Sequence, residues 1–168
     1  IDAIIARSHD VGITKILTIC TKPANGRNVK TISDKFLNVF FAVGSHPLNT
    51  LKIDKFSYEQ LIMESTHKKM IGIGETGLDY FYSKNTSEEQ KLHFKLHIAA
   101  ARECNLPVIV HSRSADEDMS KILLEEYKKA PFECVMHCFS SSLNLARTAI
   151  DLGFYLSISG IATFPKSD

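Results

Sequence analysis

Strand-like and helix-like segments alternate along the whole chain of 168 residues, and this alternation constrains the fold more than any other feature. The strand-like runs are short, apolar and rich in β-branched residues. Strands are expected at 16–20, 39–43, 70–74, 106–111, 132–139 and 154–159. Helical patterns are expected at 1–11, 57–69, 86–105, from 116 onward and at 142–153. We count six strands and six helices in strict alternation, five of the helices at these positions.

The spacing of the strands indicates the fold class. They begin about 28 residues apart on average, close to the roughly 31 residues per unit of an eight-unit βα barrel. A doubly wound open sheet has a similar period. Polar residues follow several different strands, which favours an α/β TIM (β/α)8 barrel, because such a barrel collects its active site from the C-terminal ends of many strands.

We expect residues 1–168 to form a single hydrolase domain that is an incomplete βα barrel. The first visible strand follows a helix, and six units leave about two unaccounted for if eight are needed for closure. The first strand and the last unit of the barrel are therefore expected to lie outside these residues.

Composition limits the classes of partner. Twenty basic and nineteen acidic side chains give a net charge of +1, so DNA binding must rest on a local site. No apolar run approaches the roughly 20 residues that cross a bilayer, so no membrane partner is expected. Four cysteines without a C-x-x-C pair, and no visible secretory signal, favour a reducing, cytoplasmic location. We expect a monomer or a weak oligomer.

The strongest local motif is IGIGETGLDY at 71–80. Glu75 directly follows an apolar strand and lies between two glycines, so its carboxylate could reach a metal ion or a water molecule at the barrel mouth. A cap on the next segment or a pair with a lysine explains Glu75 equally well when it is taken alone.

Three histidines accompany other strands. His111 ends an apolar strand, and His137 is the polar residue of a buried run; each alone is as compatible with a packed core histidine as with a metal ligand. His46 precedes Pro47 in a loop that could hold a phosphate or simply turn the chain. Together, one glutamate and two histidines on three successive strands predict a mouth site for divalent zinc, magnesium or manganese, and two such ions could clamp a phosphodiester.

Other chemistry-bearing residues are expected to be structural. Cys134, His137 and Cys138 do not suit a structural zinc site, because adjacent residues of a strand face opposite sides and a second cysteine pair is absent. The acidic run at 116–118 suits the start of a helix. The remaining histidines are expected on helices, in packing or in solvent: His9, His67, His93 and His97.

These motifs, in their order and spacing, resemble those of TatD-family proteins. They are GSHP at 44–47, IGIGETGLDY at 71–80, Gln90 and Phe94, LPVIVHSR at 106–113, MHCFS at 136–140 and YLSISGIATF at 155–164. The resemblance covers nearly the whole chain. It implies a TIM-barrel, metal-dependent hydrolase of the amidohydrolase type, described as a magnesium-dependent deoxyribonuclease with exonuclease activity.

The resemblance also implies roles for individual residues. Glu75 would be catalytic and bind metal, and His111 and His137 would be metal ligands. His46, Asp79 and Arg113 would contact the substrate, which would be DNA, with two divalent ions (Mg²⁺, Mn²⁺ or Zn²⁺) as cofactors. The family's His-x-His pair on the first strand and its aspartate on the eighth, a ligand and base, do not occur within 1–168, and Ser141 replaces the usual glycine.

Three hypotheses remain open from the sequence. The first is a metal-dependent phosphodiesterase acting on DNA ends. The second is a hydrolase of the same fold acting on an amide or an aminoacyl-tRNA ester, since fold does not fix function. The third is a truncated, non-catalytic barrel that binds a partner, although an open barrel would expose unpaired strand edges.

Overall fold

The computed structural model describes residues 1–51 and 55–165, in which six strands form one parallel sheet. The sheet order is sequential from the first strand to the sixth. The strands are β1 (Ile16–Cys20), β2 (Val39–Val43), β3 (Met70–Asp79), β4 (Val108–Arg113), β5 (Cys134–Met136) and β6 (Tyr155–Leu156). All six expected strands are thus confirmed, β1 and β2 with the expected bounds and the other four with changed bounds.

Helices precede and follow the strands throughout. The α-helices are α1 (Asp2–Asp10), α2 (Gly26–Lys35), α3 (Tyr58–Ser65), α4 (Tyr80–Ser83), α5 (Ser87–Cys104), α6 (Asp116–Lys129) and α7 (Leu143–Asp151). Short 3-10 helices lie at Pro23–Asn25, Pro47–Asn49, Lys84–Thr86 and Gly160–Thr163. Helix α2 is the one of the six counted helices for which no range was expected, and the short helix α4 is additional to the six. None of the described helices is long and apolar enough to span a membrane.

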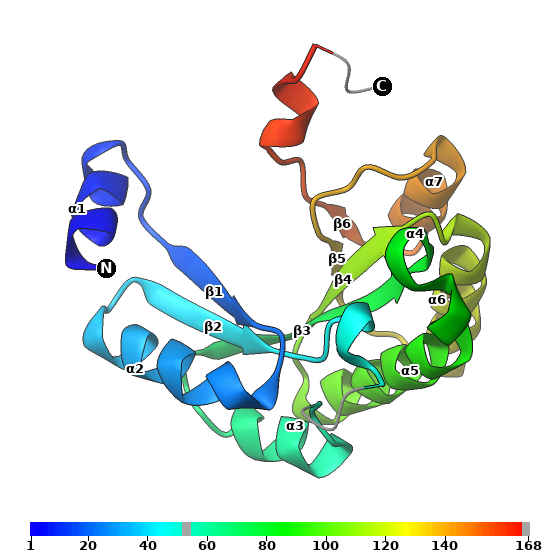
Figure 1. The fold of residues 1–168 in the computed structure, drawn as a ribbon, viewed down its shortest axis with the longest axis horizontal. Helices are drawn as coiled ribbons and strands as arrows, with labels where there is room; N and C mark the ends of the chain where they lie inside the picture. The colour runs from blue at the N-terminus through cyan, green and yellow to red at the C-terminus, as the bar shows by residue number, and fades with distance from the viewer. Residues whose placement is uncertain (52–54, 166–168) are drawn as a thin grey trace.

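The winding of the sheet decides between a barrel and a doubly wound sheet. In the described strands the order never reverses, whereas a doubly wound sheet has a switch point with helices on both faces. Helices α2, α3, α5, α6 and α7 lie on the outer side of a curved sheet whose edges are β1 and β6 (Figure 1). The described residues therefore wind as a βα barrel does.

Local chemistry explains where two helices end. Helix α3 begins with a capping box in which the Ser57 side chain accepts from the Gln60 amide and the Gln60 side chain accepts from the Ser57 amide. It ends at Ser65 and not at residue 69 as expected, because the Ser65 and Thr66 hydroxyls donate to carbonyls within the last turn. Helix α5 stops at Asn105, which adopts the left-handed conformation that commonly ends helices.

Strand bounds differ most from expectation near the polar residues. Strand β3 continues five residues beyond the expected end at residue 74, so Glu75 lies inside the strand and not after it. Strand β4 runs to Arg113 and includes His111, whereas β5 ends at Met136 and leaves His137 just beyond it.

A bulge in β3 explains this difference. Gly74 pairs with Ile109 of β4 and Thr76 pairs with Val110, so Glu75 is an extra residue without a partner in the register. Ile73 and Leu78 both pack in the core cluster although they are five positions apart, which strict alternation of side chains would forbid. The bulge therefore changes which residues of β3 face the helices.

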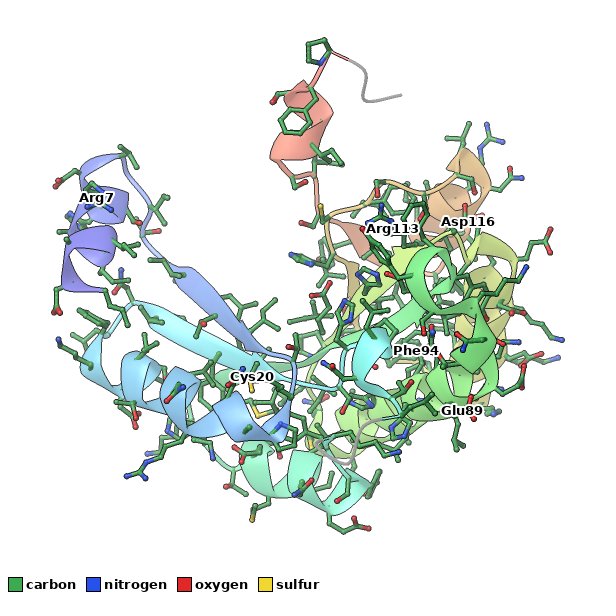
Figure 2. The ribbon with its side chains drawn as sticks, viewed as in Figure 1. Arg7, Cys20, Glu89, Phe94, Arg113 and Asp116 are labelled. Atoms are coloured by element: carbon green, nitrogen blue, oxygen red, sulfur yellow. The ribbon has the colours of Figure 1, made fainter. Side chains whose placement is uncertain are left out.

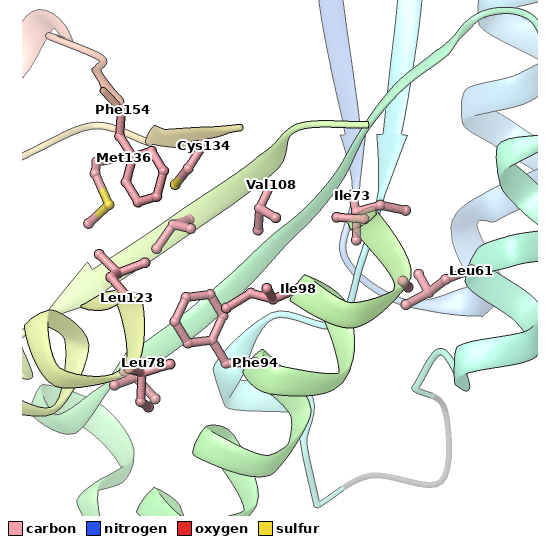
Figure 3. Close-up of a cluster of buried hydrophobic side chains, with 14 of the residues drawn as sticks. Leu61, Ile73, Leu78, Phe94, Ile98, Val108, Leu123, Cys134, Met136 and Phe154 are labelled. Atoms are coloured by element: carbon pink, nitrogen blue, oxygen red, sulfur yellow. The ribbon is translucent and has the colours of Figure 1, made fainter. Parts of the chain in front are cut away.

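The core lies between the sheet and the helices that cover it. Figure 3 shows Phe94 and Ile98 of α5 packed among side chains of β3, β4 and β5. These side chains are fully or almost fully buried. Their packing holds the middle strands at fixed positions, so the polar residues at the ends of those strands have a firm support.

Candidate functional site

Glu75 lies at the centre of a cluster of ionisable side chains. Its Oε1 atom is 3.0 Å from Nδ1 of His137 and 3.4 Å from Nδ1 of His111. Burial alone would raise the pKa of Glu75, but the hydrogen bonds with His111 and His137 outweigh it and lower the pKa to about 2. The carboxylate is therefore charged at neutral pH and can act as a ligand.

His111 lies between two carboxylates. Its Nε2 atom is 3.0 Å from Oδ2 of Asp79, on the other side of the ring from Glu75. Burial alone would lower the pKa of His111, but the hydrogen bonds with Glu75 and Asp79 raise it. The pair of carboxylates therefore stabilises positive charge at this position.

Asp79 is 1% exposed, and its side chain joins two parts of the site. One oxygen contacts His111, and the other accepts from the Tyr82 amide in helix α4. Gln90 holds the backbone of Asp79 by accepting from its amide and donating to its carbonyl. This burial favours a positioning role for Asp79 over the substrate contact that the resemblance implies. We call Glu75, Asp79 and His111 the floor.

His46 lies beside the floor on the loop after β2. Its ring centroid is 4.5 Å from that of His111. Burial lowers the pKa of His46, and the neighbouring His111 lowers it further, so the neutral form is favoured. The Leu48 amide donates to Nδ1, which assigns the remaining proton to Nε2. In this tautomer His46 is a donor suited to a substrate oxygen, as the substrate role implied by the resemblance requires.

The donor set of the site fits a divalent cation. His46, Glu75 and His111 offer donor atoms that all lie within 4.8 Å of one another, and His137 contacts the same Glu75 oxygen. Imidazole nitrogen and carboxylate oxygen are ligands that suit zinc and manganese, and carboxylates also suit magnesium. Glu75 and Asp79 stabilise a proton on His111, and a bound cation would take the place of that proton.

Close backbone approach explains the glycines around Glu75. A Cβ atom at Gly77 would collide with the carbonyl oxygen of His111, and Gly77 has a φ of +136° that residues other than glycine rarely adopt. A Cβ at Gly44 would lie 2.6 Å from the Cα of Gly74. Strands β2, β3 and β4 therefore approach at this level only because these positions lack side chains.

A cleft of about 1040 Å³ opens beside the floor, and Glu75, His111 and His137 line part of it. Arg113 also lines the cleft, and its guanidinium carbon lies 4.2 Å from the ring centroid of Phe81 and 4.8 Å from that of Tyr82. Arg113 and Asp116, both labelled in Figure 2, are among the residues that line this cleft. We call Phe81, Tyr82 and Arg113 the rim.

The sequence did not indicate two features of the site. Buried His97 accepts from the Ser45 amide through Nε2, and Ser45 Oγ accepts from the Phe56 amide, so these bonds fix the loop that carries His46. The spacing of four between His93 and His97 on α5 was a signal, but their partners were not visible. For the rim, the signal was the aromatic run 80–82 directly after a strand.

The residues expected to be structural are found in packing or in local bonds. His93 and His97 are buried in α5, and Cys134 is buried while Cys138 lies in a turn. No disulfide joins any of the four cysteines in the described residues, and Cys138 Sγ lies 2.8 Å from Ser159 Oγ. In the acidic run, the Asp116 side chain accepts from the Ser142 amide, and the Asp118 side chain pairs with Lys91 and accepts from the Tyr80 hydroxyl.

Comparison with known proteins identifies the family. The family model "TatD related DNase" matches residues 1–168. The chain is 40% identical to an uncharacterized metal-dependent hydrolase of Buchnera aphidicola, over 99% of this chain and 65% of the relative. It is 27% identical to the 3'-5' ssDNA/RNA exonuclease TatD of Shigella flexneri, over 95% of this chain and 61% of the relative.

A solved structure supports the same assignment. The crystal structure of YjjV, a TatD homolog from Escherichia coli, matches with a TM-score of 0.87 and 27% identity, over 99% of this chain and 64% of that one. The expected α/β barrel class is thereby confirmed. The chain spans less than two thirds of these proteins, and it belongs to the TatD family of metal-dependent hydrolases.

Proposed function

We propose that the natural protein is a metal-dependent phosphodiesterase that removes nucleotides from the ends of single-stranded DNA. The observation that carries the proposal is the convergence of His46, Glu75 and His111 within 4.8 Å, in contact with His137 and beside a cleft that Lys84 and Arg113 help to line. The name of the Shigella relative supports a single-stranded nucleic acid as substrate.

In this proposal the four residues of the cluster have different tasks. Glu75, His111 and His137 would hold one or two divalent ions, magnesium, manganese or zinc. In sites of this kind the ions polarise a phosphoryl oxygen and activate water. Glu75 is the catalytic carboxylate of this chain, because its charge lies among the imidazoles at neutral pH. Asp79 orients His111 by accepting from its Nε2–H when the other nitrogen binds metal.

The substrate would meet neutral and cationic donors. His46 would donate from Nε2 to a phosphate oxygen. Arg113 and Lys84 both line the cleft, so they would offset the charge of the DNA backbone. The protein would be cytoplasmic, with DNA as its macromolecular substrate, and would act as a monomer or a weak oligomer.

The test is a nuclease assay of the natural protein on end-labelled single-stranded oligonucleotides, with Mg²⁺ or Mn²⁺ and with EDTA. We expect stepwise shortening that EDTA abolishes, and a loss of at least about 100-fold for Glu75→Gln, since a metal-binding carboxylate is removed. Glu89→Gln, an exposed change on α5, is the matched control and should keep full activity.

Two results would contradict the proposal. One is unchanged nuclease activity in Glu75→Gln, and the other is no activity on any oligonucleotide with either ion. Hydrolysis of an amide or of an aminoacyl-tRNA ester in the second case would point to the alternative substrate class instead.

A further inference from the structure

The rim is an aromatic surface that the floor does not need. Phe81 and Tyr82 are 60% and 64% exposed, although their ring centroids lie 4.8 Å apart and both rings contact Arg113. Large aromatic side chains gathered in the open commonly mark a binding site. More than half of each side chain remains available to a ligand.

The exposure of the rim does not result from the open edges of the sheet. Phe81 and Tyr82 lie on α4, directly after β3, and Arg113 ends β4. Strands β3 and β4 are in the middle of the six-strand order, and the edges are β1 and β6 (Figure 1). In the described chain the strands that carry the rim are therefore flanked by other strands on both sides.

The guanidinium of Arg113, which lies over both aromatic rings, suits a phosphate attached to a flat group, while carboxylates also line the cleft. Arg113 and Lys84 line the same cleft as Phe81. Of the acidic residues there, Asp118 is paired with Lys91 and Asp116 accepts from the Ser142 amide, which leaves Glu117 as the carboxylate for which the structure shows no such bond. An aromatic face beside a guanidinium binds bases by stacking and phosphates by charge.

We propose that Phe81, Tyr82 and Arg113 form a stacking platform for an unpaired base of the substrate strand, next to the phosphate held at the floor. This inference rests on the proposed nuclease function and deepens it. The cleft of about 1040 Å³ lies at the upper end of the roughly 300–1000 Å³ of small-ligand sites, which is room for a terminal nucleotide. Because every base has an aromatic face, the platform would accept all four bases.

A binding measurement without turnover tests the platform directly. The natural protein in EDTA is titrated into a single-stranded oligonucleotide with 2-aminopurine near its end, whose fluorescence falls on stacking. We expect quenching with the parent protein. The double variant Phe81→Leu with Tyr82→Leu keeps exposed apolar side chains but loses both rings, and should bind roughly 5- to 150-fold more weakly with little quenching.

Leu37→Ala is the control for loss of an exposed apolar side chain. Leu37 is 92% exposed and precedes β2, at the opposite end of the strands from the cleft. The affinity of Leu37→Ala for the oligonucleotide and its quenching of 2-aminopurine should equal those of the parent protein. Circular dichroism of the double variant should match the parent, because both replaced side chains are on the surface.

A second substrate separates failure of the platform from failure of the nuclease function. An oligonucleotide with abasic sugars at both ends keeps the phosphates and removes the stacking groups, so with Mn²⁺ its cleavage should be slower in the parent and equal in parent and double variant. Equal cleavage of normal and abasic ends, together with unchanged binding by the double variant, would overturn the platform and leave the nuclease. Absence of binding and cleavage with every oligonucleotide would overturn both.

Discussion

The floor lies on β3 and β4, the rim lies on helix α4 and the end of β4, and the two are built differently. Asp79 is 1% exposed and is held by hydrogen bonds on both side-chain oxygens and on its backbone. Phe81 is 60% exposed and contacts its neighbours through ring faces and edges. Groups that must keep one geometry are buried and bonded at several atoms, whereas groups suited to varied bases are left adaptable. Changes to the floor should therefore affect stability and activity, and changes to the rim should affect substrate binding alone.

The largest effect is expected where β3 and β4 touch beneath the floor. Gly77→Ala adds a Cβ that collides with the His111 carbonyl oxygen at a φ of +136°, so the free energy of unfolding should fall by about 3 kcal/mol. Gly153→Ala is the control, because Gly153 also has positive φ, +79°, but has open space for a Cβ. Urea unfolding measures both. Equal losses in the two variants would show that contact between the strands adds nothing to the conformational strain.

A pH-dependent effect should follow from His97, which supports the His46 loop. Burial lowers its pKa from 6.5 to about 4. Between these values the unfolded chain binds the proton that the folded protein excludes, so stability falls as the pH drops from about 6.5 to 4. The loss should reach about 3 kcal/mol at most.

His97→Gln removes this titration and still offers an acceptor to the Ser45 amide. Its free energy of unfolding, measured by urea titration at several pH values, should vary less between pH 6.5 and 4 than that of the parent. Identical pH profiles would mean that His97 is not the source of the dependence.

A smaller effect is expected for Asp79, which joins floor and rim. Asp79→Asn keeps the shape and can still accept from the Tyr82 amide, but it removes the charge opposite His111. We expect a 10- to 100-fold loss of metal affinity or activity, as found for groups that orient metal-binding histidines. Isothermal titration with Mn²⁺ and the nuclease assay measure it. Unchanged metal affinity would place Asp79 outside the site.

The smallest effect on the fold is expected at the rim. Arg113→Lys keeps the charge but loses the planar group that lies on Phe81 and Tyr82. The free energy of unfolding should change by less than about 0.5 kcal/mol, since Arg113 is exposed. KM for an oligonucleotide should rise about fivefold with little change in kcat. A large loss of stability would break the distinction between floor and rim.

Patterns along the chain predicted much of the fold. The strands at Ile16–Cys20 and Val39–Val43 were predicted to the residue, because apolar β-branched runs are bounded there by turns. The helix after Gly26 was harder to place, because Pro23–Gly26 has the composition of a turn and does contain a 3-10 turn before α2 begins. Local composition does not report how a turn continues.

The site was predictable in part for the same reason. Glu75, His111 and His137 were selected as polar residues at apolar strands, and the structure brings them together. The bulge at Glu75 was not predictable, since it depends on how β3 pairs with β4 across more than 30 residues of chain. The contacts of Arg113 with Phe81 and of His97 with Ser45 likewise join residues that no local pattern relates.

Because of the bulge at Glu75, the length of strand β3 decides which of its side chains face the helices. Gly74 and Thr76 are partners of consecutive residues of β4, so every side chain after Glu75 is out of phase with those before it. One residue more or fewer between Met70 and Gly74 would reverse the faces of the side chains before the change relative to those after it. Descendants of this chain can therefore exchange residues along β3 far more easily than they can change its length.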